Sequence, residues 1–259
     1  MKLIINKPIA PIHKLPTIAS ERVDEALYGN RCKAIRREGD FYYITTSYGY
    51  EGYLKVEDAV EDKELDRKDF FQVHSSFADV LLEANVRSQV LFNVPRGAMM
   101  SSGEKEAPEG YMAISLVDGI IAYTREKHLK KSTKLEMKKS IFRGRVVEAA
   151  LSYKGAPYRW GGKTPLGIDC SGLTFMAYHL NGVDIWRDSY FKEGYPMHKI
   201  SHKDAKRGDL VHFPGHVAML LDGGYIIHSS YDNCGVAVER LSLNKKLADS
   251  ILYFTTLRL

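Results

Sequence analysis

Cys170 is the residue of this chain whose surroundings best suit nucleophilic chemistry. It stands in the segment GIDCSGL, directly before an apolar stretch that repeats at helical spacing. The N-terminus of a helix carries unpaired N–H groups and the positive end of the helix dipole, and both stabilise a thiolate. The N–H group of Cys170 would itself lie in the first turn, where it is placed to help bind an oxyanion. The alternative is that Cys170 is a small buried hydrophobic residue that caps the helix.

Two histidines further along the chain are spaced to act together. His216 begins the segment HVAMLL and His228 lies in the segment YIIHSS, and residues 222–224 (DGG) between them indicate a hairpin turn. If these three residues form the loop, Ala218 pairs with His228, and His216 lies diagonal to His228 on the same face of the sheet, about 7–8 Å away at the backbone. A two-residue loop would put the histidines on opposite faces. A catalytic pair therefore requires the three-residue loop, and the alternative for each histidine alone is a satisfied strand residue.

The other cysteines and histidines lack such a context. We expect surface or packing residues at three histidines: His179, His202 and His212. We expect structural thiols at two cysteines in strand-like segments: Cys32 and Cys234. A metal site is disfavoured because no paired Cys and His spacing typical of zinc is present, so we expect neither a metal nor a cofactor.

The segment that contains these residues predicts an α+β domain. Apolar residues repeat at helical spacing up to about residue 154 and again over residues 171–180, where Asn181-Gly182 supplies a C-terminal stop. Five strand-like segments follow: residues 209–213, 216–221, 225–230, 235–241 and 251–257. Helices followed by antiparallel strands are typical of the α+β class.

The first half of the chain contains two similar segments, at residues 23–60 and 88–129. Each has an apolar stretch, a polar turn, an alternating strand (FYYITT or YMAISL), a glycine turn and a short strand. Short alternating strands between turn residues predict small β-barrels. The second copy is less regular, and one irregular β domain is the alternative for it.

Composition sets limits on partners and compartment. The 259 residues are 44% hydrophobic and 27% charged, with a formal net charge of +5, which is an ordinary balance for a globular protein. The basic residues between 125 and 139 are interleaved with acids, which favours a solvated linker over a polyanion-binding face, so no nucleic-acid partner is expected.

Three widely spaced cysteines imply no disulfide framework. No signal peptide or apolar run of membrane-spanning length is present, so we expect no membrane association and, if Met1 is the native start, a cytoplasmic protein.

Five elements in order, YxWGG, DCSGL, GDL, GHV and IH, run between about residues 146 and 230 and resemble the NlpC-type peptidases, a papain-like family of bacterial cell-wall enzymes. The resemblance implies that Cys170 is the nucleophile, that His216 is the general base and that His228 orients it. It also implies that Tyr158 contacts the oxyanion and that Asp169 and Ser171 bind the substrate.

The same resemblance implies a papain-like catalytic domain at residues 140–259, after a linker at 129–139 and two SH3-like β-barrels at 1–63 and 64–128. Within the family, this domain order resembles that of enzymes that cut murein peptides between γ-D-glutamate and a diamino acid. Those enzymes require a free N-terminal L-alanine. Such enzymes place an acid and a tyrosine of the first β domain at the substrate's amino end, which implies substrate binding by Glu25 and Tyr50. The alternatives are an acyltransferase or amidase on the same fold and a non-catalytic wall-binding module.

Overall fold

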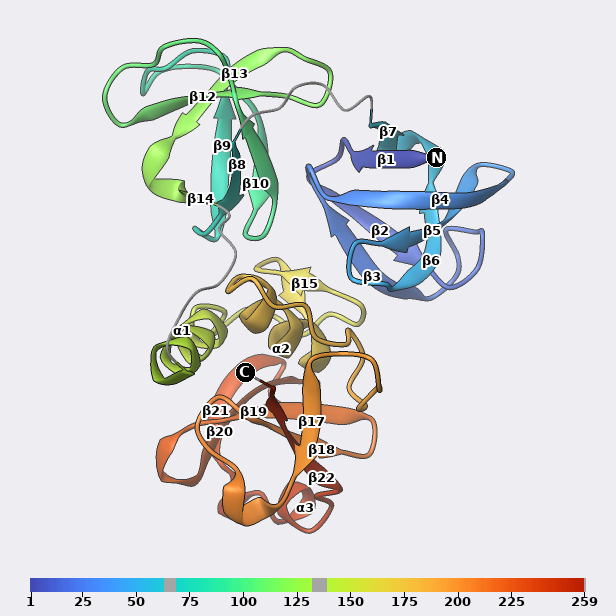
Figure 1. Cartoon of the computed structure of the whole chain (residues 1–259), viewed down its shortest axis with the longest axis vertical. Coiled ribbons are helices and arrows are strands. Elements are labelled where there is room, and N and C mark those ends of the chain that lie inside the picture. The colour runs from blue at the N-terminus through green and yellow to red at the C-terminus, as the bar shows by residue number, and fades with distance from the viewer. Residues whose placement is uncertain (63–68, 132–138, 259) are drawn as a thin grey trace. The chain divides into compact units, whose positions relative to one another are not determined.

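The computed structural model describes residues 1–62, 69–131 and 139–258, the last range with backbone alone for 139 and 140. The chain forms two compact units, Met1–Thr133 and Lys134–Leu259 (Figure 1). Within the described residues, no helix combines the length and the apolar character needed to cross a membrane. The predicted linker at 129–139 lies mostly outside the described residues, but its first three residues form a strand of the first unit.

The first unit consists of two antiparallel sheets built on one plan. The strand orders are β3-β2-β6-β5-β4-β1-β7 and β10-β9-β13-β12-β11-β8-β14, which become identical when seven is added to each number of the first sheet. A short 3₁₀ helix precedes the last strand in both, at Val56–Asp58 and Glu126–His128. The strands of the first sheet are β1 Lys2–Ile5, β2 Ile9–His13, β3 Arg22–Leu27, β4 Arg31–Glu38, β5 Phe41–Thr46, β6 Glu51–Lys55 and β7 Ala59–Glu61. Those of the second are β8 Phe70–Val73, β9 Phe77–Leu81, β10 Val90–Pro95, β11 Met99–Ser102, β12 Tyr111–Ser115, β13 Ile121–Arg125 and β14 Leu129–Lys131.

The repeat predicted from sequence is present, and in each copy two short strands precede the similar segment predicted at residues 23–60 or 88–129. The two copies start with β1 and β8, which lie inside the domains predicted at 1–63 and 64–128. The second copy has the same strand order as the first, which favours a second β domain of the same kind over one irregular domain. The sheets contact each other through Tyr28, whose ring lies 5.3 Å from that of Phe92 and whose hydroxyl accepts from the N–H of Val117.

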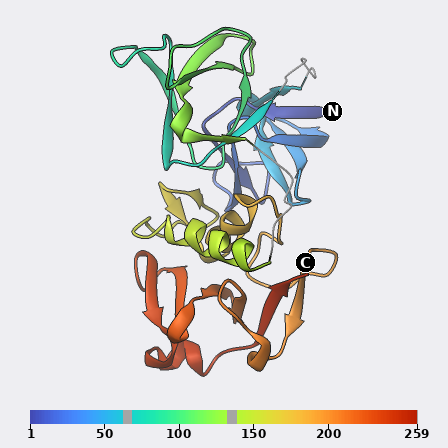
Figure 2. The ribbon, with the colours of Figure 1, turned by 60° about the vertical axis from the view of Figure 1, so that its left-hand side comes forward.

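The second unit has two main helices on one side of a sheet, as Figures 1 and 2 show. Helix α1 (Lys139–Leu151) ends three residues before the predicted limit, and α2 (Cys170–His179) confirms the second predicted helix. A two-stranded ribbon of β15 (Lys163–Thr164) and β16 (Gly167–Ile168) leads into α2. Helix α2 has no exposed residue along its length, which is why its sequence is apolar.

The sheet of the second unit has the order β17-β22-β18-β19-β20-β21 and is antiparallel throughout. The five predicted strands are present as β18 Leu210–Phe213, β19 His216–Leu220, β20 Tyr225–Ser230, β21 Gly235–Arg240 and β22 Tyr253–Leu257. Edge strand β17 (Met197–Ile200) was not predicted, and a short helix α3 (Lys245–Ala248) precedes β22. The α+β class with β-rich N-terminal domains is confirmed.

The hairpin of β19 and β20 has the predicted register. Met219 pairs with Ile227 and Leu220 with Ile226, and the N–H of Leu221 donates to the carbonyl of Tyr225. Residues 222–224 form the loop as one 3₁₀ turn, in which Gly223 has a positive φ of 69°. The two-residue loop is excluded, and His216 and His228 project from the same face of the sheet.

The first turn of α2 packs directly against the backbone before it. A Cβ atom on Gly172 would lie 2.3 Å from the carbonyl oxygen of Gly162, whereas one on Gly144 in α1 would meet nothing within 4 Å. The two helical glycines therefore offer a matched pair for testing this contact.

We expect Gly172→Ala to lower the free energy of unfolding by about 1–3 kcal/mol through overpacking, and Gly144→Ala to raise it by about 0.5–1 kcal/mol because alanine is the better helix former. The measurement is urea unfolding followed by tryptophan fluorescence. The chain has two tryptophans, Trp160 and Trp186, and both lie in the second unit. Equal effects of the two substitutions would contradict the close contact at Gly172.

Candidate active site

Cys170 is the first residue of α2 and lies against the start of β19. Its side chain is buried, and the backbone N–H groups of Ser171 and Val217 donate to its sulfur. Val217 follows His216 directly in the chain, so this contact brings the predicted nucleophile to the strand that carries the predicted base. The helix starts one residue earlier than predicted, and the N-cap is Asp169.

Asp169 is held by protein donors on both carboxylate oxygens. Oδ1 accepts from the N–H of Gly172 at 2.6 Å, as an N-cap does, and Oδ2 accepts from the N–H of Gly161 at 2.8 Å. Arg187, only 1% exposed, also donates to both oxygens, at 3.1 and 3.3 Å, and to the Ser171 hydroxyl at 2.9 Å. The expectation that Asp169 and Ser171 line the substrate site stays a prediction, and what the geometry shows is a buried polar cluster that fixes the start of α2.

His216 and His228 are joined by a hydrogen bond between Nε2 of His216 and Nδ1 of His228, 2.8 Å long. The ring centroids are 5.1 Å apart and the rings meet edge to face. The diagonal placement predicted from the hairpin is confirmed. Because Nε2 of His216 is used in this contact, Nδ1 is the nitrogen left for proton exchange.

The far side of His228 contacts residues that the sequence analysis did not single out. Nε2 of His228 lies 3.0 Å from Oε1 of Glu239 on β21 and 3.1 Å from Nδ2 of Asn233. His228 itself is 2% exposed, whereas the side chain of Glu239 is 26% exposed. Glu239 has no local motif around it, and only the pairing of β20 with β21 brings it to the histidine.

The electrostatics favour a neutral resting pair. Burial, followed by the charge of Asp169, raises the pKa of the Cys170 thiol to about 12, against the opposing effect of the two N–H groups that face the sulfur. Burial, followed by the proximity of His228, lowers the pKa of His216 to about 4, and burial also lowers that of His228. The N–H group of Ser171 favours a thiolate, as expected at a helix N-terminus, whereas burial and the capping carboxylate of Asp169 oppose it.

Tyr158 lies near Cys170. Burial raises the pKa of its hydroxyl to about 12, with the electrostatic effects of the nearby Cys170 and Asp169 as further causes. Its backbone N–H donates to the carbonyl of Cys234, and its ring meets that of Tyr231 edge to face at 6.4 Å. Contact between its hydroxyl and an oxyanion stays a prediction.

Glu25 and Tyr50 belong to the first unit, and both are buried there. Glu25 lies in β3 with Nη1 of Arg22 at 3.5 Å, and the backbone N–H of Tyr50 donates to Oγ1 of Thr46 at 2.9 Å. Beside them, a buried acid–tyrosine pair that was not singled out is hydrogen-bonded: the hydroxyl of Tyr48 donates to the carboxylate of Asp24. Substrate binding by Glu25 and Tyr50 stays a prediction.

The remaining cysteines and histidines have other surroundings. Cys32 is in the core of the first sheet, where burial raises its pKa to about 12, and Cys234 is exposed in a turn with a φ of 54° rather than in a strand. His212 is buried, with Ser189 and Thr255 as hydrogen-bond partners. Among the described residues, no group of three His, Cys, Asp or Glu side chains is arranged to hold a metal ion.

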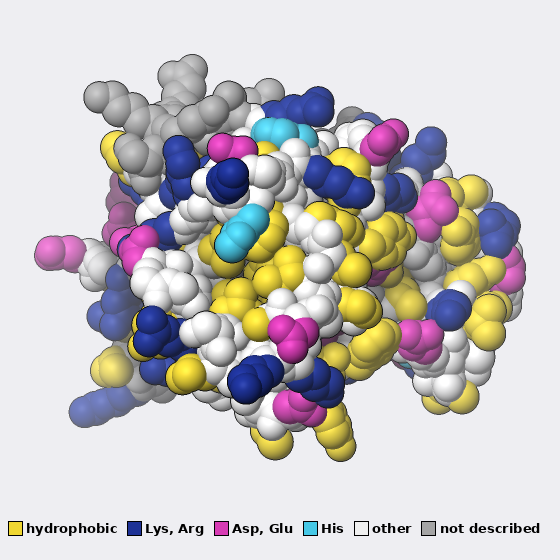
Figure 3. All heavy atoms as spheres, turned by 90° about the horizontal axis from the view of Figure 1, so that it is seen from below, with side chains coloured by type: hydrophobic (Ala, Val, Ile, Leu, Met, Phe, Trp, Pro, Cys, Tyr) yellow, Lys and Arg dark blue, Asp and Glu magenta, His cyan; other side chains and the backbone are white. Residues whose placement is uncertain are grey.

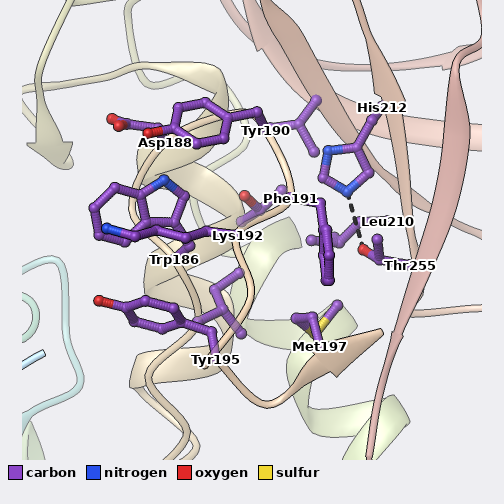
Figure 4. A pocket seen from close by; sticks show the side chains of 13 residues that line it. Trp186, Asp188, Tyr190, Phe191, Lys192, Tyr195, Met197, Leu210, His212 and Thr255 are labelled. Carbon is purple, nitrogen blue, oxygen red and sulfur yellow. Dashed lines mark hydrogen bonds between the residues drawn. The ribbon is translucent and has the colours of Figure 1, made fainter. Parts of the chain in front are cut away.

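Two cavities lie near the sheet of the second unit. Figure 4 shows the smaller one, about 20 Å³, between the aromatic residues after α2 and the side of the sheet that carries His212 and Val217. It has room for about one water molecule. The larger hollow, about 440 Å³, contains neither Cys170 nor the two histidines and is lined by apolar residues with Lys206, Arg207 and Arg240. Figure 3, which views the molecule from the side of α3, shows hydrophobic side chains gathered on this face.

Residues 155–250 match the NlpC/P60 family. Dipeptidyl-peptidase 6 of Lysinibacillus sphaericus is 37% identical over 249 residues, which are 93% of this chain and 92% of that protein. Gamma-D-glutamyl-L-lysine dipeptidyl-peptidase of Bacillus subtilis (strain 168) is 29% identical over 119 residues, or 41% of this chain and 38% of that protein. The crystal structure of an NlpC/P60 family protein from Bacillus cereus ATCC 10987 covers 98% of both chains with a TM-score of 0.82 at 18% identity, which shows a shared fold.

The lowered pKa of His216 predicts the acid limb of catalysis. A base whose pKa is lowered stays neutral, and so able to accept a proton, down to a lower pH than an ordinary imidazole. We therefore expect kcat/KM for a peptide substrate to fall on acidification near pH 4 rather than near pH 6.5. Circular dichroism at each pH is the control for unfolding, because an unfolded histidine takes up protons from about pH 6.5 and stability falls below that pH. An acid limb at pH 6.5 with the fold intact would contradict the neutral, buried base.

The buried pair of Arg187 and Asp169 predicts a large loss of stability when one partner is removed. We expect Arg187→Met to lower the free energy of unfolding by about 3–5 kcal/mol, because the Asp169 carboxylate is left buried and unpaired. The matched control is Arg207→Met, which removes an exposed pair with Asp222 and is expected to cost less than about 1 kcal/mol. Urea unfolding of both variants is the measurement. Similar losses would show that the cluster at the start of α2 does not depend on Arg187.

Proposed function

The chain belongs to the NlpC/P60 family and is a cysteine peptidase, and we propose that it hydrolyses the bond between γ-D-glutamate and a diamino acid in murein peptides with a free N-terminal L-alanine. The observation that carries the proposed site is the arrangement of Cys170 and His216. The sulfur accepts from the N–H of Val217, next to a histidine whose Nε2 is already hydrogen-bonded to His228.

The reaction is acyl transfer through Cys170. Nδ1 of His216 takes the thiol proton as the sulfur attacks the amide carbonyl, so charge develops only when substrate is in place. The N–H groups at the start of α2 and the hydroxyl of Tyr158 stabilise the oxyanion. His216 then returns the proton to the leaving amine, and water, activated by the same nitrogen, hydrolyses the thioester. No step requires a cofactor.

The substrate assignment is supported by the relatives. Their names describe a dipeptidyl-peptidase, and in one case a γ-D-glutamyl-L-lysine bond. The order of two β domains before the catalytic domain is similar to the domain order of dipeptidyl-peptidase VI. This similarity favours release of L-Ala-γ-D-Glu as the reaction. Such a substrate suits the recycling of wall fragments inside the cell, and we include that role in the proposal. An acyltransferase or amidase on this fold would use the same residues.

The test is mass spectrometry of the products from L-Ala-γ-D-Glu-L-Lys, L-Ala-γ-D-Glu-meso-diaminopimelate and their N-acetylated forms. We expect release of L-Ala-γ-D-Glu from at least one free peptide, and at least about tenfold slower release from its acetylated form. Cys170→Ala and His216→Ala should abolish release, while Cys234→Ala, which removes an exposed thiol, should not.

Product analysis also separates the alternatives. Transfer of the dipeptide to an added amine in preference to water would indicate an acyltransferase. Equal cleavage of free and acetylated peptides would contradict the requirement for a free amino terminus. Full activity in Cys170→Ala would contradict the proposed nucleophile.

A further inference from the structure

Glu239 stands at the end of a line of three side chains that crosses three neighbouring strands. His216 is on β19, His228 on β20 and Glu239 on β21. In the pairing of β20 with β21, His228 is opposite Ala237 and Ile226 is opposite Glu239, so Glu239 is diagonal to His228. This repeats the diagonal relation of His216 to His228. The line ends in a carboxylate oxygen 3.0 Å from Nε2 of His228.

A carboxylate can only accept a hydrogen bond, and this decides where the protons lie along the line. Nε2 of His228 must carry hydrogen to donate to Oε1 of Glu239. In neutral His228, Nδ1 then has the lone pair and accepts from Nε2–H of His216 at 2.8 Å. In neutral His216, Nδ1 is left without hydrogen. That nitrogen can take the proton of a thiol, whereas the other tautomer would offer an N–H and no base.

We propose that Glu239 is a positioning residue that fixes the tautomers of His228 and His216, so that Nδ1 of His216 is the basic nitrogen. This inference deepens the proposed function and rests on it for its kinetic part. Glu239 does not touch the reacting atoms. It acts through His228, which orients the ring of His216 and also fixes the tautomer of His216.

The other polar neighbours of His228 do not fix its tautomer. Asn233 lies 3.1 Å from Nε2, but an amide can present either its oxygen or its NH₂ group, so it accommodates both tautomers. Asp232 acts on both histidines through its charge and is largely exposed. Asn244 holds Glu239 in place by donating to the same Oε1 at 3.1 Å.

The line also accounts for the charge formed in the reaction. When Nδ1 of His216 takes the thiol proton, His216 becomes a cation with hydrogen on both nitrogens, and its Nε2–H still donates to His228. His228 stays neutral and still donates to Glu239, which stays a carboxylate. The imidazolium is thus two hydrogen bonds from a negative charge, and the proton it took leaves again with the amine product.

The test uses the full chain with three substitutions, Glu239→Ala, Glu239→Gln and, as the matched control, Asp232→Asn. The control removes a nearby negative charge without removing an acceptor from Nε2 of His228. Histidine ¹⁵N chemical shifts report the tautomers without substrate, and steady-state kinetics on the cleaved peptide report their consequence. We expect one tautomer of His216, with hydrogen on Nε2, in the wild type and in Asp232→Asn, and a mixture of both in Glu239→Ala.

In kinetics we expect Glu239→Ala to lower kcat about tenfold or more with KM changed by less than about twofold. Asp232→Asn should retain kcat within about twofold. Glu239→Gln keeps an acceptor oxygen but can also turn its NH₂ group to the histidine, so it should fall between the wild type and Glu239→Ala in both measurements. A partial rescue of this kind distinguishes a hydrogen-bond acceptor from a residue that only fills space.

Unchanged ¹⁵N shifts in Glu239→Ala would overturn the proposal, whatever the activity. A loss that lies in KM or in folding, with the tautomer kept, would overturn it as well. If the wild type cleaves none of the murein peptides, the proposed function fails, and the shifts still decide the role of Glu239, because they need no substrate.

Discussion

The register of the β19–β20 hairpin is the constraint on which the site depends. A three-residue loop places Leu221 opposite Tyr225, and from there strand geometry alone puts His216 and His228 on one face at diagonal positions. A shift by one residue would turn one ring to the opposite face and break their hydrogen bond. The next pairing, of β20 with β21, adds Glu239 by the same rule. The proposed proton path is thus a property of the sheet, whose strands are held by backbone hydrogen bonds and a shared core.

The start of α2 places the Cys170 sulfur beside the proposed proton path, but the charge at this helix end disfavours the thiolate. Asp169 caps the helix and is bound by Arg187, which holds the first turn rigidly against the preceding backbone. The same carboxylate, together with burial, raises the pKa of Cys170. Burial thus disfavours both the thiolate of Cys170 and the imidazolium of His216. We infer that nucleophilicity arises during proton transfer to His216, when the oxyanion contacts and the charge of Glu239 compensate the charges that form.

Local patterns predicted the parts of the structure that local sequence controls. Both main helices of the second unit, five of the six strands of its main sheet and the spacing of the two histidines followed from periodicity and from one loop. Edge strand β17 was missed because the segment MHKI is half polar and pairs on one side only. The first strands of each β domain were missed because they are short and lie among prolines and turn residues.

The N-cap role of Asp169 had a signal, since aspartate before an apolar helix is a preferred cap. Arg187 and Glu239 had none, because a lone charged residue is usually solvent-exposed and only tertiary pairing buries it.

The central claim is that Cys170 forms a covalent acyl intermediate after transferring its proton to His216. The most direct measurement is acid quenching of the enzyme during turnover of L-Ala-γ-D-Glu-L-Lys or its diaminopimelate counterpart, followed by proteolysis and mass spectrometry. The account predicts that the peptide containing Cys170 carries an added L-alanyl-γ-D-glutamyl group as a thioester, and that the group is absent from the peptides containing Cys32 and Cys234. An acyl group on any other residue, or turnover at full rate with Cys170 unmodified at every quench time, would contradict it.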